Sequence, residues 1–248
     1  RRGCNDDVFD HLSSTRHPSE SWDPVPWLFK GAGSLDPSFR WGDEQRASCP
    51  RYPLMAGLRV RPHSAAADGT VLEVTPASAG WNHVGFKLVK LAAGQRHAGG
   101  EAGREACLVI VAGLADVDAG GRHFMHVGGR SNPFEDRAPG AVYVPAGMPW
   151  EVIASGPVEL AVCTAPGTGQ DEPRLIAESS MSREVRGEGT NTRHVRNILP
   201  QTEPADSLLV VEVITPGGHW SSYPPHKHDT AAPGAETALE ETYYHRLN

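Results

Sequence analysis

Three side chains near the C-terminal end of the sequence have the types and spacing of a metal site. His226 and His228 are separated by one residue, and residues i and i+2 of a strand point to the same face. Glu241 falls on the next expected strand, so a hairpin would bring its carboxylate across from the two imidazoles. Imidazole with carboxylate suits Zn, Mn, Fe, Co or Ni, and spacing does not choose among them. Two solvated histidines beside Lys227 are the alternative.

The elements that would position such a site are short strands. Alternating or continuous apolar runs recur at near-regular spacing and end in turn-forming residues, and we find no convincing amphipathic helix. The runs are residues 71–74, 86–91, 106–113, 115–121, 141–147, 158–164 and 207–214. This pattern predicts an all-β sandwich or barrel.

Composition excludes some partners. The net charge of −7 makes nucleic acid and anionic membranes unfavourable partners. No apolar run is long enough to cross a bilayer, and the N-terminus lacks the pattern of a signal peptide. Cys4, Cys49, Cys107 and Cys163 form no CxxC pair, so we expect reduced, buried thiols in a cytoplasmic protein.

The first 54 residues differ from the rest. They hold three of the six tryptophans but no sustained apolar periodicity, which predicts an irregular or disordered extension. Met55 opens the patterned part, and we expect it to be the natural start. An N-terminal arm that packs on a partner subunit is the alternative. Residues 166–200 are expected to be an irregular connection, because turn-forming and hydrogen-bonding residues gather there.

An internal repeat divides the patterned region. Residues 55–165 resemble a cupin barrel, since Glu105 and Gly113 match the end of the first cupin motif and residues 145–147 match the turn of the second. Only His97 stands where the motif has a histidine pair, and Trp150 stands where the second motif has its histidine. We therefore expect the first barrel to have lost its metal site, with His97 and Glu105 as solvated side chains. Residues 201–248 are expected to begin a second, metal-binding barrel.

A closer resemblance covers about residue 57 to the end. The sequence is similar to the 5-deoxy-glucuronate isomerase family of myo-inositol catabolism, which is related to the 5-keto-4-deoxyuronate isomerases. The similar stretches are residues 74–81, 187–193, 197–200, 205–213, 220–229 and 239–248.

This resemblance implies a bicupin of two tandem double-stranded β-helix barrels and a cytoplasmic isomerase. The enzyme would convert 5-deoxy-D-glucuronate into 2-deoxy-5-keto-D-gluconate with a divalent metal ion, Zn or Mn being expected first. His226, His228 and Glu241 would be its ligands, and a fourth, a histidine, would come from beyond Asn248. The second barrel would then be incomplete, and we expect weak metal binding and little activity from this chain alone.

Acid and base groups for such a reaction lie beside the metal ligands. Glu240 and Tyr243 or Tyr244 are the candidates. On a regular strand Tyr243 shares a face with Glu241, whereas Glu240 shares the opposite face with Tyr244. Barrel packing is the alternative role for the tyrosines.

The carboxylate of a uronic-acid substrate would need a cation. Arg193, Lys227 and Arg246 are the candidates, although a regular strand would point Lys227 away from its flanking histidines. Two other functions share these features: a metal-dependent cupin dioxygenase and a sugar-binding bicupin without catalysis. A homo-oligomer is compatible with all three.

Overall fold

The computed structural model describes residues 25–31, 59–221, 228–232 and 237–247, with 25–31 described by backbone alone. Nearly all of its regular structure consists of antiparallel strands, which confirms the all-β prediction. The helical segments are α1 (Pro76–Ala79), η1 (Glu178–Ser180) and η2 (Gly189–Asn191). Among the described residues, no helix is long and apolar enough to cross a membrane.

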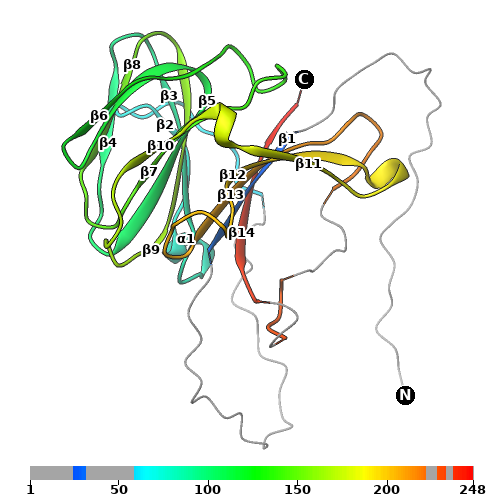
Figure 1. The fold of residues 1–248 in the computed structure, drawn as a ribbon. Helices are drawn as coiled ribbons and strands as arrows, with labels where there is room; N and C mark the ends of the chain where they lie inside the picture. The colour runs from blue at the N-terminus through cyan, green and yellow to red at the C-terminus, as the bar shows by residue number, and fades with distance from the viewer. Residues whose placement is uncertain (1–24, 32–58, 222–227, 233–236, 248) are drawn as a thin grey trace, which may run out of the picture.

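The first unit is built from nine strands (Figure 1). They are β2 (Thr70–Val74), β3 (Gly85–Leu91), β4 (Arg96–Gly99), β5 (Arg104–Ala119), β6 (Arg122–Arg130), β7 (Gly140–Val144), β8 (Trp150–Ala154), β9 (Val158–Pro166) and β10 (Arg174–Ile176). The main path runs β10-β7-β5-β9-β3-β2, and β4, β6 and β8 join it through pairing with β5 or with one another.

Strand β5 belongs to two sheets because it bends. Its first part pairs with β7 and β9, and its second part pairs with β6 and β8. Gly113 lies at the change of partner with φ of +97°, and a Cβ there would meet the Pro157 carbonyl oxygen at 2.3 Å. Only glycine fits such a position. Apolar side chains of both sheets, among them Leu108, Val117 and Val152, fill the space between the sheets.

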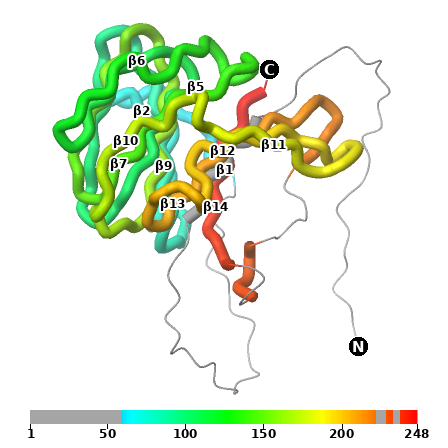
Figure 2. The backbone as a smooth tube through the Cα atoms, viewed as in Figure 1, coloured from blue at the N-terminus to red at the C-terminus, as the bar shows by residue number. Residues whose placement is uncertain are grey.

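A second sheet packs against the outer face of the first unit, as both views show (Figure 1, Figure 2). Its order is β11 (Ser182–Arg186), β12 (Arg193–Leu199), β13 (Leu208–Ile214), β1 (Val25–Gly31) and β14 (Glu240–Arg246). The apolar layer between the units includes Phe86, Cys163, Leu199 and Tyr244, all buried. Burial of this layer is what holds the second sheet to the first unit.

Three strands of each unit have the same arrangement. β9 lies between β3 and β5 and is antiparallel to both, and β1 lies between β13 and β14 in the same way. The registers also match. A row of paired residues, Leu88–Ala161–Val109, has the counterpart Glu212–Trp27–Tyr244.

A buried ion network joins the two units. The carboxylate of Glu212 on β13 accepts hydrogen bonds from Arg130 Nη2 at 2.6 Å, Arg130 Nη1 at 3.1 Å and Arg196 Nη1 at 2.7 Å. The side chains of Arg130 and Glu212 are fully buried, and that of Arg196 is 5% exposed. Arg130 Nε also donates to the Val111 carbonyl at 2.7 Å, which fixes the guanidinium on the first unit.

Two regions have more regular structure than the sequence predicted. Val25–Gly31 forms a strand inside the segment expected to be irregular, and the expected connection 166–200 contains β10, β11 and β12. β1 pairs with strands that are distant in sequence, so local periodicity carries no sign of it. Every residue of β11 is exposed, which removes the apolar alternation used to recognise strands.

The prediction of reduced, buried thiols is confirmed for two cysteines. Cys107 and Cys163 are free and buried on neighbouring strands. Burial raises the pKa of the Cys107 thiol to about 12, which keeps it protonated. Cys4 and Cys49 lie outside the described residues.

Candidate active site on the C-terminal strand

Strand β14 presents two different faces. Tyr244 is buried between the units, with its ring centroid 6.0 Å from that of Phe86, and its hydroxyl donates to Glu159 at 2.9 Å. Tyr243 is 37% exposed, and its hydroxyl donates to Glu241 Oε2 at 2.5 Å. The predicted alternation is therefore confirmed: Glu241 and Tyr243 share the face directed away from the first unit.

Glu240 is directed toward the first unit. Its carboxylate accepts hydrogen bonds from the backbone N–H groups of Asn82, His83 and Val84 at 2.8, 2.8 and 3.0 Å. These groups precede β3 and have no strand partner of their own at that point. Glu240 thus links the two units in this structure, and its side chain lies on the opposite face of β14 from Glu241.

Glu105 makes the reciprocal contact. Its carboxylate accepts from the backbone N–H groups of Asp206, Ser207 and Leu208 at 2.9, 2.7 and 2.7 Å, at the start of β13. The Tyr143 hydroxyl also donates to the Glu105 carboxylate at 2.6 Å. The pKa of Tyr143 is raised, first by burial and second by this hydrogen bond to a carboxylate. Glu105 at the start of β5 therefore corresponds to Glu240 at the start of β14.

This correspondence corrects the sequence comparison, which matched Glu105 with the glutamate of the first cupin motif. If Glu105 matches Glu240, the counterpart of Glu241 in the first unit is the following residue, Ala106. Glu105 and His97 were expected to be solvated, but they are 0% and 5% exposed. The first unit thus has alanine where the second has its candidate metal carboxylate.

We expect Glu240→Gln to weaken folding more than chemistry. A neutral amide oxygen replaces a charged acceptor for the Asn82, His83 and Val84 amides, and hydrogen bonds to charged groups contribute about 1.5–3 kcal/mol. The free energy of unfolding, measured by urea titration, should fall by about 2 kcal/mol. Turnover by the remaining folded protein should stay within a few-fold of the parent. Unchanged stability with lost turnover would instead place Glu240 in the chemistry.

His228 approaches the start of β14. The Leu239 amide donates to the His228 carbonyl at 2.9 Å, and the ring Nδ1 contacts the Thr237 carbonyl oxygen at 3.1 Å. A carbonyl only accepts, so Nδ1 carries a proton in this contact. The expected strand geometry does not hold at this residue, because His228 lies in a turn with φ of +71°.

The exposed face of β14 continues beyond Tyr243. The rings of Tyr243 and His245 are stacked, with centroids 6.1 Å apart and planes 9° apart. Partial desolvation of the ring by neighbouring groups lowers the pKa of His245, which favours its neutral form. A carboxylate, a phenol and a neutral imidazole therefore follow one another at Glu241, Tyr243 and His245.

The chemistry of these donors fits a divalent ion. His228 offers an imidazole nitrogen oriented by a carbonyl, which is the usual arrangement of a metal-binding histidine, and Glu241 offers a carboxylate. The described residues alone contain no cluster of three histidine, cysteine, aspartate or glutamate side chains suited to a metal. His226 and Lys227 lie outside the described residues.

Two candidate substrate-binding residues lie away from Glu241. Arg246 shares the inner face of β14 and forms an ion pair with Glu159 at 3.4 Å. Arg193 is the first residue of β12, and the next residue, His194, pairs with Ile214 at the end of β13. Glu241 lies in the same row as Leu209, near the start of β13, because both pair with the same residue of β1. Neither arginine therefore lies beside Glu241 in the sheet.

The antiparallel all-β fold, with a carboxylate and an imidazole at the start of β14, is that of a cupin-like protein. The chain belongs to the KduI/IolB family, whose model matches residues 58–248.

Curated relatives support this assignment. The chain is 48% identical over 194 residues to the 5-deoxy-glucuronate isomerase of Geobacillus kaustophilus, covering 78% of this chain and 70% of that protein. It is 47% identical over 194 residues to the enzyme of the same name from Geobacillus thermodenitrificans, covering 78% and 71%.

A solved structure is similar as well. The crystal structure of an IolB-like protein from Salmonella typhimurium LT2 superposes with a TM-score of 0.67 at 46% identity, covering 70% of this chain and 66% of that one. Both the fold and the sequence therefore point to the same family.

Proposed function

We propose that this protein is a 5-deoxy-glucuronate isomerase. The observation that carries the proposal is the 48% identity to a curated relative of that name, over 78% of this chain. The stretch matched by the family model includes Glu241 and Tyr243. The reaction would be the aldose–ketose isomerisation of 5-deoxy-D-glucuronate to 2-deoxy-5-keto-D-gluconate.

The finer architecture that we propose is a bicupin. The β3-β9-β5 and β13-β1-β14 sets share order, direction and register. Glu105 and Glu240 make reciprocal contacts from equivalent positions. These observations support two copies of one β unit, with β13 and β14 belonging to the second.

The proposed metal ligands are His226, His228 and Glu241. A bound Zn²⁺ or Mn²⁺ would supply Lewis-acid polarisation of the substrate aldehyde and its neighbouring hydroxyl. In this chain, Thr237 orients His228 through its carbonyl, and the Tyr243 hydroxyl donates to the carboxylate of Glu241.

Proton movement is the second part of the proposal. Isomerisation moves a hydrogen from C2 to C1, and a general base positioned on the substrate side carries it as a proton. Tyr243 is the favoured group, since it is the candidate acid or base on the Glu241 face, whereas Glu240 is engaged by three backbone amides. Of the cations proposed for the substrate carboxylate, Arg246 is held by Glu159, which leaves Lys227 and Arg193 as proposals from sequence.

The test is an isomerisation assay under argon. The chain is incubated with 5-deoxy-D-glucuronate and Zn²⁺ or Mn²⁺, and the ketose is followed by NMR. We expect ketose to form slowly without oxygen, in keeping with the weak metal binding expected from the sequence, to stop on chelation and to resume when the metal is restored. Substrate deuterated at C2 should lose label to water if a proton is transferred. Absence of ketose, or a requirement for oxygen, would contradict the proposal.

A further inference from the structure

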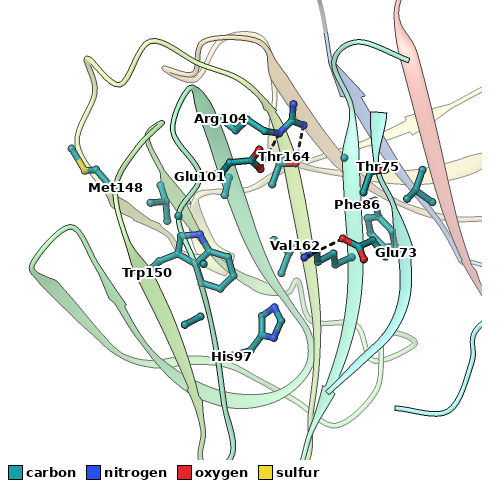
Figure 3. Close-up of a pocket in the computed structure, with 18 of the residues that line it drawn as sticks. Glu73, Thr75, Phe86, His97, Glu101, Arg104, Met148, Trp150, Val162 and Thr164 are labelled. Atoms are coloured by element: carbon teal, nitrogen blue, oxygen red, sulfur yellow. Dashed lines mark hydrogen bonds and ion pairs between the residues drawn. The ribbon is translucent and has the colours of Figure 1, made fainter. Parts of the chain in front are cut away.

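The first unit contains a cavity of about 440 Å³ between its facing sheets. Its size falls within the range of ligand sites, about 300–1,000 Å³. Val144, Val162 and Ala106 are among its apolar lining, and polar side chains from several strands line the rest (Figure 3). Because Ala106 corresponds to Glu241, the cavity occupies in the first unit the place that the candidate active site has in the second.

An arginine is held rigidly in this cavity. Arg104 Nη2 donates to the His83 carbonyl at 2.7 Å and to Thr164 Oγ1 at 2.9 Å, and the side chain is only 14% exposed. Gly85 makes room for this contact, since a Cβ there would lie 2.6 Å from Thr164 Oγ1. Within the described part of the chain, Arg104 Nη1 makes no hydrogen bond, and the nearest carboxylate, that of Glu101, is 3.8 Å from Nε and largely exposed.

A histidine and a tryptophan line the opposite side, as Figure 3 shows. His97 is 5% exposed, and its Nδ1 donates to the Asp68 carbonyl at 3.0 Å. Its Nε2 is therefore an acceptor in the neutral ring, and it has no hydrogen-bond partner among the residues the structure describes. The ring centroids of Trp150 and His97 are 5.8 Å apart. Lys87 adds a second cation at the rim, 3.1 Å from Glu73.

We propose that this cavity binds a small hydroxylated carboxylic acid, such as a sugar acid. The carboxylate would pair with Arg104 and Lys87, since a fixed guanidinium presents several donors to a carboxylate. Sugar hydroxyls would donate to His97 Nε2 and to the rim glutamates. The C–H groups of the sugar would pack on Trp150, whose ring offers an apolar surface with a polar edge. This second site does not depend on the isomerase assignment.

The test is calorimetric binding of D-glucuronate to the Glu241→Gln variant, in which the candidate active site is disabled. We expect one saturable site per chain, with quenching of tryptophan fluorescence. Arg104→Gln should lower the affinity by about ten- to a hundredfold, the effect of losing a hydrogen bond to a charged group. Lys87→Gln, at a side chain 41% exposed, gives a second test that does not risk the fold, and it should lower the affinity in the same direction.

Lys90→Gln is the matched control, because Lys90 lies on the same strand, is exposed, and does not line the cavity. Its affinity for D-glucuronate should equal that of the parent. Neutral D-glucose should bind at least tenfold more weakly than D-glucuronate. No saturable binding, equal binding of D-glucose, or full affinity in both Arg104→Gln and Lys87→Gln would overturn the proposal.

Discussion

Glu241→Gln is expected to lower turnover on the order of a hundred- to a thousandfold. The carboxylate is the proposed anionic metal ligand, and a bound metal contributes several kcal/mol of transition-state stabilisation, at about 1.4 kcal/mol for each tenfold in rate. The amide keeps the shape of the side chain but loses the charge. Because Glu241 faces away from the layer between the units, the free energy of unfolding should change little.

Two measurements separate this effect from misfolding. The affinity of the chain for Zn²⁺ or Mn²⁺, measured by calorimetry, should fall together with turnover. Tyr243→Phe removes the hydroxyl that donates to Glu241. It should lower metal affinity or turnover by about 10–100-fold, the usual effect of removing a hydrogen-bond partner of a metal ligand. Glu240→Gln is the neighbouring control on the opposite face. A Glu241→Gln variant with parental metal affinity and turnover would remove Glu241 from the site.

Glu212→Ala is expected to destabilise the fold by about 3–5 kcal/mol, the cost of removing one partner from a buried ion pair. The change leaves the guanidinium groups of Arg130 and Arg196 in the layer between the units without their shared carboxylate, at side chains 0% and 5% exposed. Urea unfolding, followed by tryptophan fluorescence, measures the loss.

The matched control for Glu212 is another glutamate paired with arginine. Glu184 on β11 pairs with Arg186, and their side chains are 42% and 48% exposed. Exposed ion pairs contribute about 0–1 kcal/mol, so Glu184→Ala should leave the unfolding midpoint nearly unchanged. If the two variants lost similar amounts of unfolding free energy, burial of the network around Glu212 would not be the cause of the expected effect.

The sequence predicted correctly those features that depend on the residue pattern within a single strand. Apolar alternation predicted an all-β chain, and alternation along residues 240–246 placed Tyr243 with Glu241. Alternation predicts which side chains share a face of a strand, but it does not predict which residues contact that face. For that reason the contacts of Glu240 with residues 82–84, and of Glu105 with residues 206–208, were missed: their partners lie more than a hundred residues away in the chain.

The same limit explains the first unit. Glu105 carries the residue type of a metal ligand, and sequence comparison alone matched it with the cupin motif. Its burial and its hydrogen bonds to the other unit show a structural carboxylate, one residue away from the position that corresponds to Glu241. A shift of one residue moves a side chain to the opposite face of a strand, so motif matching without register could not distinguish the two positions.

Strand β1 has a consequence for the order in which the protein is made. Both of its neighbours, β13 and β14, are synthesised after the entire first unit. After β1 is synthesised, it has no strand partner of its own until β13 emerges, whereas the first unit can form its sheets from contiguous sequence in the meantime. Because β1 lies between β13 and β14, the five described strands of the second sheet can come together only after β14 has been synthesised.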